Sequence, residues 1–134
     1  MTPSPLLQVL GQSRPLQEAL AKKSPIRSYV APPGAQPIII SQLIETSQDP
    51  VAIIAASSKE ADEIAAELLN LQPDIEVIDF PAWETLPHER LSPSPETVGR
   101  RLRALHRMHE IKQNGADHKV VIKLSIRAAL QPVV

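Results

Sequence analysis

The sequence predicts an α/β fold in which helices cover both faces of a parallel β-sheet. Short apolar runs of strand length alternate along the chain with segments whose apolar residues recur at helical spacing: VAIIAA (51–56), IEVIDF (75–80) and VVI (120–122). VAIIAA is uninterrupted by charge, as expected of a strand buried on both faces. The 134 residues are 43% hydrophobic and 22% charged, which indicates one globular domain or part of one.

The first third of the chain is predicted to hold short elements. Residues 1–13, which contain Pro and Ser, are expected to form a flexible N-terminus ahead of a domain over residues 14–134. A helix is predicted over Arg14–Lys23 (RPLQEALAKK). A short strand is predicted over Ile26–Ala31, broken by the Pro-Pro-Gly that follows, and a helix from Pro37 to about Ser47.

Two longer helices are predicted in the rest of the chain. Ser58 is expected to cap the first, KEADEIAAELLNL, whose early acidic residues suit the helix dipole. Ser94 is expected to cap the second, roughly 95–113, with Pro95 in the first helical position. Four residues of the second helix are predicted to face the core: Val98, Leu102, Leu105 and, marginally, Met108.

The second long helix also carries most of an uneven charge distribution. The net charge is −1, but residues 1–89 have a balance of −7 and residues 90–134 a balance of +6. Arg100, Arg103 and Arg107 are predicted to share the outer face, with Arg101 apart. These four arginines either form a solvated surface or contact nucleic acid or a neighbouring domain. Aromatic residues that would stack on bases are absent from the helix, which disfavours single-strand recognition.

The stretch FPAWETLPHERLSPSPE (80–96) contains the only Phe, the only Trp and four prolines. Proline excludes both a long helix and an inner strand here. Because the stretch follows a strand, it is expected at the carboxyl edge of the sheet, where α/β proteins bind ligands. A structural clasp is predicted, with Phe80 and Trp83 pinning the loop to the sheet. The residues assigned to this clasp are Phe80, Trp83, Glu84, Leu86, Pro87 and Arg90.

Signs of catalysis, metal binding or cofactor binding are weak. The turn APPGAQPIII (31–40) has one glycine and neither the Lys nor the hydroxyl of a phosphate loop, so nucleotide binding is not expected. His106 and His109 have metal-ligand spacing, but no matching Cys or carboxylate pair accompanies them. Glu84 and Glu89 have no nucleophile beside them. No catalytic residue, metal ligand or cofactor is therefore assigned, and an enzyme is not expected.

Two further absences bound the class of protein. The chain has no Cys, which excludes disulfides and thiolate metal sites within it. There is no signal-peptide pattern and no run of about eighteen apolar residues, so a cytoplasmic location without a membrane is expected.

Two motifs, taken together, resemble a known family. WETLPHERLSP (83–93) and the ending IRAALQPVV (126–134) after a strand resemble the N-terminal region of the bacterial transcription-repair coupling factor, Mfd. That region is similar to the first domain of the repair protein UvrB, and the resemblance spans roughly residues 14–134. It implies a partial RecA-like, P-loop-type fold, with a degenerate phosphate loop at APPGAQP and an incomplete C-terminal end. One departure is Lys123-Leu124, where the family has a small residue and then Ser or Pro. Because a Lys at the end of a buried strand is costly unless it reaches solvent, this departure fits a truncated or decaying gene product.

The resemblance also implies a function. The chain is expected to be a non-catalytic scaffold fragment of a factor in transcription-coupled nucleotide excision repair, one that supports UvrA docking in the parent protein. The parent's partners are UvrA, RNA polymerase and DNA, and its ATP-dependent translocase motor and UvrA-docking domain are expected to lie outside these 134 residues. The alternative is a weak, sequence-independent nucleic-acid-binding module that uses the basic helix.

Overall fold

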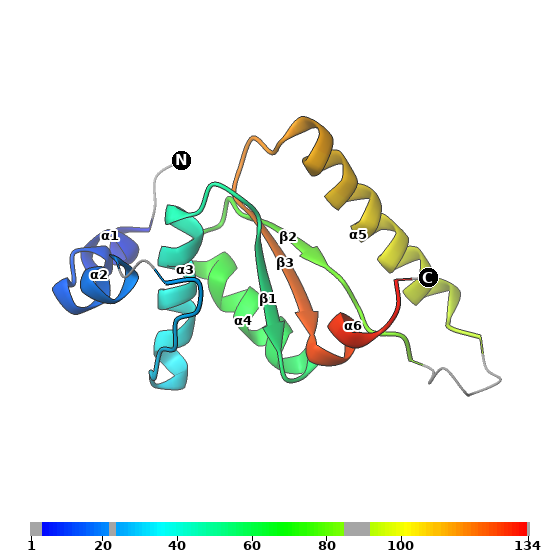
Figure 1. Cartoon of the computed structure of the whole chain (residues 1–134), viewed down its shortest axis with the longest axis horizontal. Helices are drawn as coiled ribbons and strands as arrows, with labels where there is room; N and C mark the ends of the chain where they lie inside the picture. The colour runs from blue at the N-terminus through cyan, green and yellow to red at the C-terminus, as the bar shows by residue number, and fades with distance from the viewer. Residues whose placement is uncertain (1–3, 22–23, 85–91, 134) are drawn as a thin grey trace.

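The computed structural model describes residues 4–21, 24–84 and 92–133, and a parallel three-stranded sheet lies at its centre (Figure 1). The strands are β1 (Val51–Ala55), β2 (Glu76–Asp79) and β3 (Val120–Ser125), in the order β1-β3-β2. β3 pairs in parallel with both neighbours, so Val121 lies opposite Val51 on one side and Val77 on the other. The three predicted core strands and the α/β class are confirmed.

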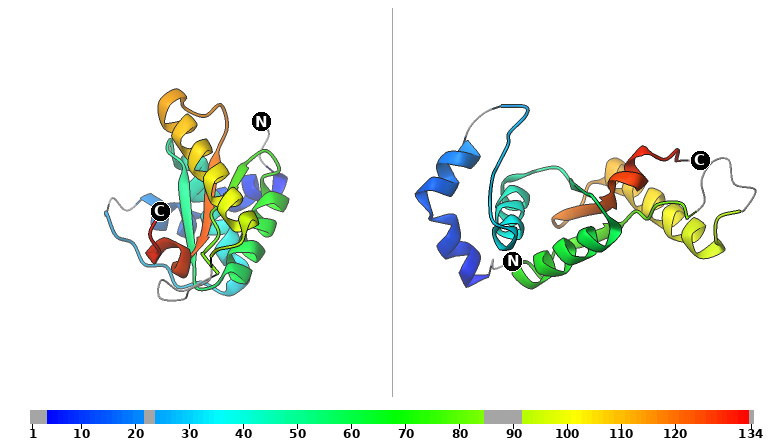
Figure 2. Two further views of the ribbon diagram at one scale, coloured as in Figure 1. Left: turned by 90° about the vertical axis from the view of Figure 1, so that its right-hand side faces the viewer. Right: turned by 90° about the horizontal axis from the view of Figure 1, so that it is seen from below.

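Helices cover both faces of the sheet (Figures 1 and 2). One face packs against α3 (Gln36–Thr46) and α4 (Ser58–Leu71), and the other against α5 (Pro95–Asn114) and α6 (Ile126–Leu130). The N-terminal segment adds α1 (Pro5–Gly11) and α2 (Arg14–Ala21), and a 3-10 turn, η1 (Pro33–Ala35), precedes α3. The prediction of a layered sheet with helices on both faces is therefore confirmed.

Each face of the sheet has its own apolar cluster. On the α3/α4 face, Val121 of β3 is enclosed by Ile44 and Leu68 from the two helices and by Ile53 of β1. On the opposite face, Ile78 and Phe80 pack with Ala104 and Ile111 of α5, together with Ala128 of α6. β1 contributes only to the first cluster, and Ile54, which points to the α5/α6 face, is 55% exposed. The prediction that this strand is buried on both faces is therefore wrong.

The helix starts illustrate how capping chemistry sets boundaries. Ser57, rather than the predicted Ser58, caps α4: its hydroxyl accepts from the Glu60 amide at 3.1 Å. Glu60 in turn accepts from the Ala56 amide at 3.0 Å, an arrangement similar to a capping box but with the residue before the cap as donor. Ser94 caps α5 as predicted, with Pro95 in the first turn.

Three short segments differ from the sequence-based prediction. The predicted strand over Ile26–Ala31 is wrong: this segment is irregular and pairs with no strand of the described residues, and Val30 is fully exposed. Its β-branched composition favours a strand, but a strand needs a neighbour for its backbone hydrogen bonds. Two helices were not predicted, α1, which buries Leu7, and α6, whose Ser125 cap accepts from the Ala128 amide. The division of the chain into a flexible segment 1–13 and a domain 14–134 stays a prediction.

Candidate interaction site at the carboxyl edge of the sheet

The chain segments that follow the three strands converge at the carboxyl edge of the sheet, as expected of parallel strands. They enclose a cleft of about 360 Å³. Its lining comes from both helical layers and from the ends of β2 and β3. Its polar members include Ser58, Asp62, Asp79, Glu84, Thr97, Arg100, Lys123, Ser125 and Arg127.

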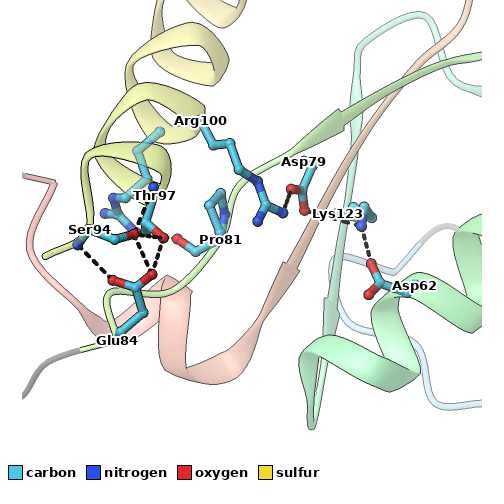
Figure 3. A network of polar contacts seen from close by, with 9 residues as sticks. Asp62, Asp79, Pro81, Glu84, Ser94, Thr97, Arg100 and Lys123 are labelled. Carbon is cyan, nitrogen blue, oxygen red and sulfur yellow. Dashed lines mark hydrogen bonds and ion pairs between the residues drawn. The ribbon is translucent and has the colours of Figure 1, made fainter.

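A chain of ion pairs crosses this edge from α4 to α5 (Figure 3). The Lys123 ammonium of β3 lies 3.1 Å from Asp79 Oδ1 of β2 and also contacts the Asp62 carboxylate of α4. Arg100 of α5 contacts the other oxygen of Asp79. The four side chains thus alternate in charge, Asp62–Lys123–Asp79–Arg100, and each of the two middle groups has two partners of opposite charge.

This pairing explains how a Lys can lie at the end of a buried strand. Its side chain is only 15% exposed, so its burial has a real desolvation cost. Burial alone lowers the pKa of Lys123, but the hydrogen bonds with Asp62 and Asp79 outweigh it and the pKa is raised. Burial alone likewise raises the pKa of Asp79, but hydrogen bonds from Arg100 and Lys123 outweigh it and the pKa is lowered. The register of β3 is regular through this residue, so Lys123 is no sign of a damaged strand.

Glu84 ties the start of the Pro-rich loop to the first turn of α5 (Figure 3). Its carboxylate accepts from the Ser94 amide at 3.0 Å and the Ser94 hydroxyl at 2.7 Å, and also from the Thr97 hydroxyl. These hydrogen bonds lower the pKa of Glu84 to about 2, and the bond from the Ser94 hydroxyl has the largest effect. A carboxylate of this chain therefore occupies the helix N-terminus, where an external anion would otherwise bind.

The two aromatic residues of the loop lie close together beside the C-terminal segment. Phe80 is buried, and its amide donates to the Lys123 carbonyl at 3.0 Å. Trp83 is half-buried: its amide donates to Gln131 Oε1 at 2.6 Å and its indole Nε1 donates to the Pro132 carbonyl at 3.1 Å. The other residues assigned to the predicted clasp, Leu86, Pro87 and Arg90, lie outside the described residues, as do His88 and Glu89.

Arg101 is the central residue that sequence reasoning misplaced. It was grouped with possible DNA or partner contacts, but its side chain is only 1% exposed and belongs to the buried stripe of α5. The stripe contains Thr97, Arg101, Ala104 and Ile111, whereas Leu102, predicted to face the core, is exposed. The helical spacing of 97, 101 and 104 could have revealed this stripe, but charge was taken as a sign of exposure.

The arginines on the outer side of α5 lie along the edge strand β2. Arg107 donates two hydrogen bonds, of 2.7 and 2.9 Å, to the Glu76 carboxylate, and Arg100 contacts the Asp79 carboxylate through one nitrogen. The hydrogen bond from Arg107 lowers the pKa of Glu76 and outweighs burial, which acts to raise it. The bond to Glu76 in turn raises the pKa of Arg107. Arg103 makes no ion pair with any described residue, and with Arg100 and Arg107 it lines a groove of about 330 Å³ beside Asp79.

The remaining histidines are not arranged as a metal site. His118 lies 2.7 Å from Glu76, and His106 lies 3.4 Å from Glu110 on its own helix. Within residues 4–21, 24–84 and 92–133, no three His, Asp or Glu side chains gather closely enough to hold a metal ion. None of the helices in this described part is both long and apolar enough to cross a membrane.

The turn at residues 31–40 forms η1 and the start of α3, with Pro37 in the helix's first turn. No side chain caps this helix start. The nearest preceding cation, Arg27, donates to the carbonyls of Leu20 and Ser24 at 2.8 and 3.3 Å. The turn thus supplies backbone groups but no charge of its own.

Comparisons with known proteins agree with the resemblance carried by the two motifs. No protein-family model matches the sequence. The chain is 38% identical over 138 aligned residues to the transcription-repair-coupling factors of Mycobacterium bovis and Mycobacterium tuberculosis, an alignment that covers 98% of this chain. It is 32% identical over 81 residues, 60% of this chain, to the transcription-repair-coupling factor of Haemophilus influenzae. The chain spans 11% of the length of the mycobacterial proteins and 7% of the Haemophilus protein. Over nearly its whole length, this chain therefore belongs with the bacterial transcription-repair-coupling factors, as the counterpart of one segment of those proteins.

Proposed function

We propose that this chain is a non-catalytic scaffold domain of transcription-coupled nucleotide excision repair, which supports the docking of UvrA by a longer coupling factor. The observation that carries the proposal is the match over 98% of the chain to coupling factors, of whose length it covers only a small part. A segment of that size contributes to a larger assembly, so its surfaces and stability matter more than a reaction of its own.

The geometry of the carboxyl edge supports a scaffold rather than a nucleotide site. In a nucleotide-binding α/β domain, cations and helix N-termini at this edge are left free for phosphate. Here Lys123 and Arg100 pair with carboxylates of the same chain, and Glu84 occupies the α5 N-terminus. Together with the turn at residues 31–40, this favours a degenerate phosphate loop on a RecA-like framework.

The two outer strands of the sheet differ in a way that supports a larger framework. β2 carries Glu76 and Asp79, each paired with an arginine of α5, and such charges protect a free strand edge. β1, VAIIA, carries no charge, and its Ile54 is 55% exposed. An uncharged apolar edge is a site for strand addition, so we infer that β1 receives a further strand from the longer factor.

A chimaera tests this proposal. The matched segment of the Mycobacterium tuberculosis coupling factor is replaced by this chain, and UvrA binding is measured by surface plasmon resonance beside the unmodified factor. A working scaffold retains UvrA binding in the chimaera, while the 134 residues alone bind none. Loss of binding in a folded chimaera, or UvrA binding by the 134 residues alone, would refute the proposal.

The β1 edge is tested in the same chimaera. Ile54→Lys should lower the melting temperature of the chimaera more than that of the 134 residues alone, because only the longer factor supplies a further strand beside β1. Val9→Lys, which adds the same charge at an exposed apolar residue of α1, serves as the matched control. Equal effects of the two substitutions would count against strand addition at β1.

The alternative function, weak DNA binding through α5, rests on Arg103 and the groove that it lines. The carboxylates of Asp79 and Glu76 already neutralise Arg100 and Arg107, so the face offers less free charge than its sequence suggests. Any such binding should therefore be weak and strongly salt-dependent.

A further inference from the structure

The two motifs that carry the family resemblance meet in space around Arg101. The loop after β2 contributes Phe80 and Trp83, and the segment after α6 contributes Gln131 and Pro132. We infer that Arg101 is a positioning residue of a latch that makes these two segments, about fifty residues apart in sequence, open and close as one unit. The latch is a property of this chain alone and does not rest on the proposed function.

The Arg101 guanidinium contacts both segments at once. Its Cζ lies 4.2 Å from the centroid of the Phe80 ring and 4.3 Å from that of Trp83. One terminal nitrogen donates to the Pro81 carbonyl at 2.7 Å and the other to the Pro132 carbonyl at 3.1 Å. A planar guanidinium can stack on both rings while its two separate nitrogens donate to two carbonyls, whereas an ammonium is a compact charge with no planar face to stack.

The environment of Arg101 makes an intermediate arrangement costly. The side chain is buried and has no carboxylate partner among the described residues, and its Nε has no hydrogen-bond partner there. Burial lowers the pKa of Arg101, yet a guanidinium stays charged in proteins. Among the described residues, two aromatic faces and two carbonyls stabilise this charge, so loss of either segment removes a large part of that stabilisation.

The two segments also bind each other directly. The Trp83 amide donates to Gln131 Oε1 at 2.6 Å, and Gln131 Nε2 donates back to the Trp83 carbonyl at 3.2 Å. The Pro132 carbonyl accepts from both the Trp83 indole and Arg101. Each contact therefore orients the groups that make the next one, and the latch sets the path of the chain beyond α6.

The experiment uses the single Trp of the chain, which gives one indole N–H signal in a nitrogen-15 correlation spectrum. Hydrogen exchange is measured for the Trp83 indole, for the Trp83 amide and for the amide of residue 131, which donates to the Arg127 carbonyl at 3.2 Å. The variants are Arg101→Met, Gln131→Ala and the double variant. Arg103→Met is the matched control, because Arg103 lies on the same helix and makes no ion pair with the described residues. The Val121 amide in the sheet reports global opening.

Each single substitution should accelerate exchange of the indole about three- to tenfold, the range expected when one or two hydrogen bonds are lost. The Val121 amide should accelerate by no more than this factor and should still exchange far more slowly than the indole, so that the opening is local. The amide of residue 131 should accelerate to the same extent, and the double variant should exchange no faster than the faster single variant. Arg103→Met should change none of these rates.

Independent opening of the two segments would refute the latch. It would appear as a Gln131→Ala variant with wild-type indole exchange, or as a double variant whose acceleration is the product of the two single ones. Arg101→Lys distinguishes geometry from charge: it should behave like Arg101→Met, and wild-type exchange in Arg101→Lys would refute the role of the planar guanidinium. If Arg101→Met does not fold, Gln131→Ala and Arg101→Lys still decide the question.

Discussion

Replacing Lys123 by Met removes the ammonium from the centre of the ion-pair chain while keeping a side chain of similar length. Breaking a fully buried ion pair costs about 3–5 kcal/mol of unfolding free energy, whereas an exposed pair contributes about 0–1 kcal/mol. The Lys123 and Asp79 side chains are 15% and 33% exposed, which places their pair between these limits. Asp79 also keeps Arg100 after the substitution. We therefore expect Lys123→Met to cost about 1–2 kcal/mol.

Urea denaturation followed by circular dichroism measures this cost, with Asp62→Ala as the control. Asp62 is 62% exposed, so its removal should cost no more than about 0.5 kcal/mol. Adding Asp79→Asn to Lys123→Met should cost less than the sum of the two single effects, because the two residues share one interaction. If Lys123→Met were as stable as the wild type, or no less stable than Asp62→Ala, then Lys123 reaches solvent and the ion pair contributes nothing to the free energy of unfolding.

Three further predictions follow from the site. Because the pKa of Glu84 is lowered, the folded state favours its ionised carboxylate, and the stability that this contributes is present above pH 4.5 and is lost as the pH falls towards about 2. The difference in melting temperature between wild type and Glu84→Gln should therefore shrink over that interval. A constant difference would refute the assignment. Titration calorimetry with Mg-ATP should show no saturable heat up to about 1 mM, which corresponds to a binding free energy of about −4 kcal/mol, and a micromolar dissociation constant would contradict this. Arg103→Ala should weaken any low-salt binding to duplex DNA more than Arg100→Ala or Arg107→Ala, whose charges are already paired, and equal losses from the three would show that the pairs open on binding.

Local patterns were sufficient for most of the regular elements. The apolar run at β1 and the capping signals of α4 and α5 lie within a few residues of the structure that they specify, so they could be found without a fold. The Ile26–Ala31 segment has the same kind of pattern but pairs with no strand of the described residues. Composition reports whether a segment suits a strand, whereas pairing depends on which other segment lies beside it.

The sequence predicted where the candidate site lies but not which residues form it. The Pro-rich loop does follow β2 at the carboxyl edge, because parallel strands end on the same side. Lys123 was read as an anomaly and Arg101 as a surface charge, since their partners come from segments far away in the chain. The outer arginines were read as free, and the carboxylates of β2 that pair with Arg100 and Arg107 could not be assigned to them before the position of β2 at the sheet edge was known.

By itself, the sequence determined the order and extent of the main helices and strands, the α/β class, the capping of α5 and the family of the chain, because each depends on neighbouring residues or on a contiguous motif. Only the tertiary structure decided which charges are paired and which are buried. Arg101 shows the reason: two aromatic rings and the carbonyls of Pro81 and Pro132 stabilise its charge, and these groups meet only when the segments after β2 and α6 fold together over α5.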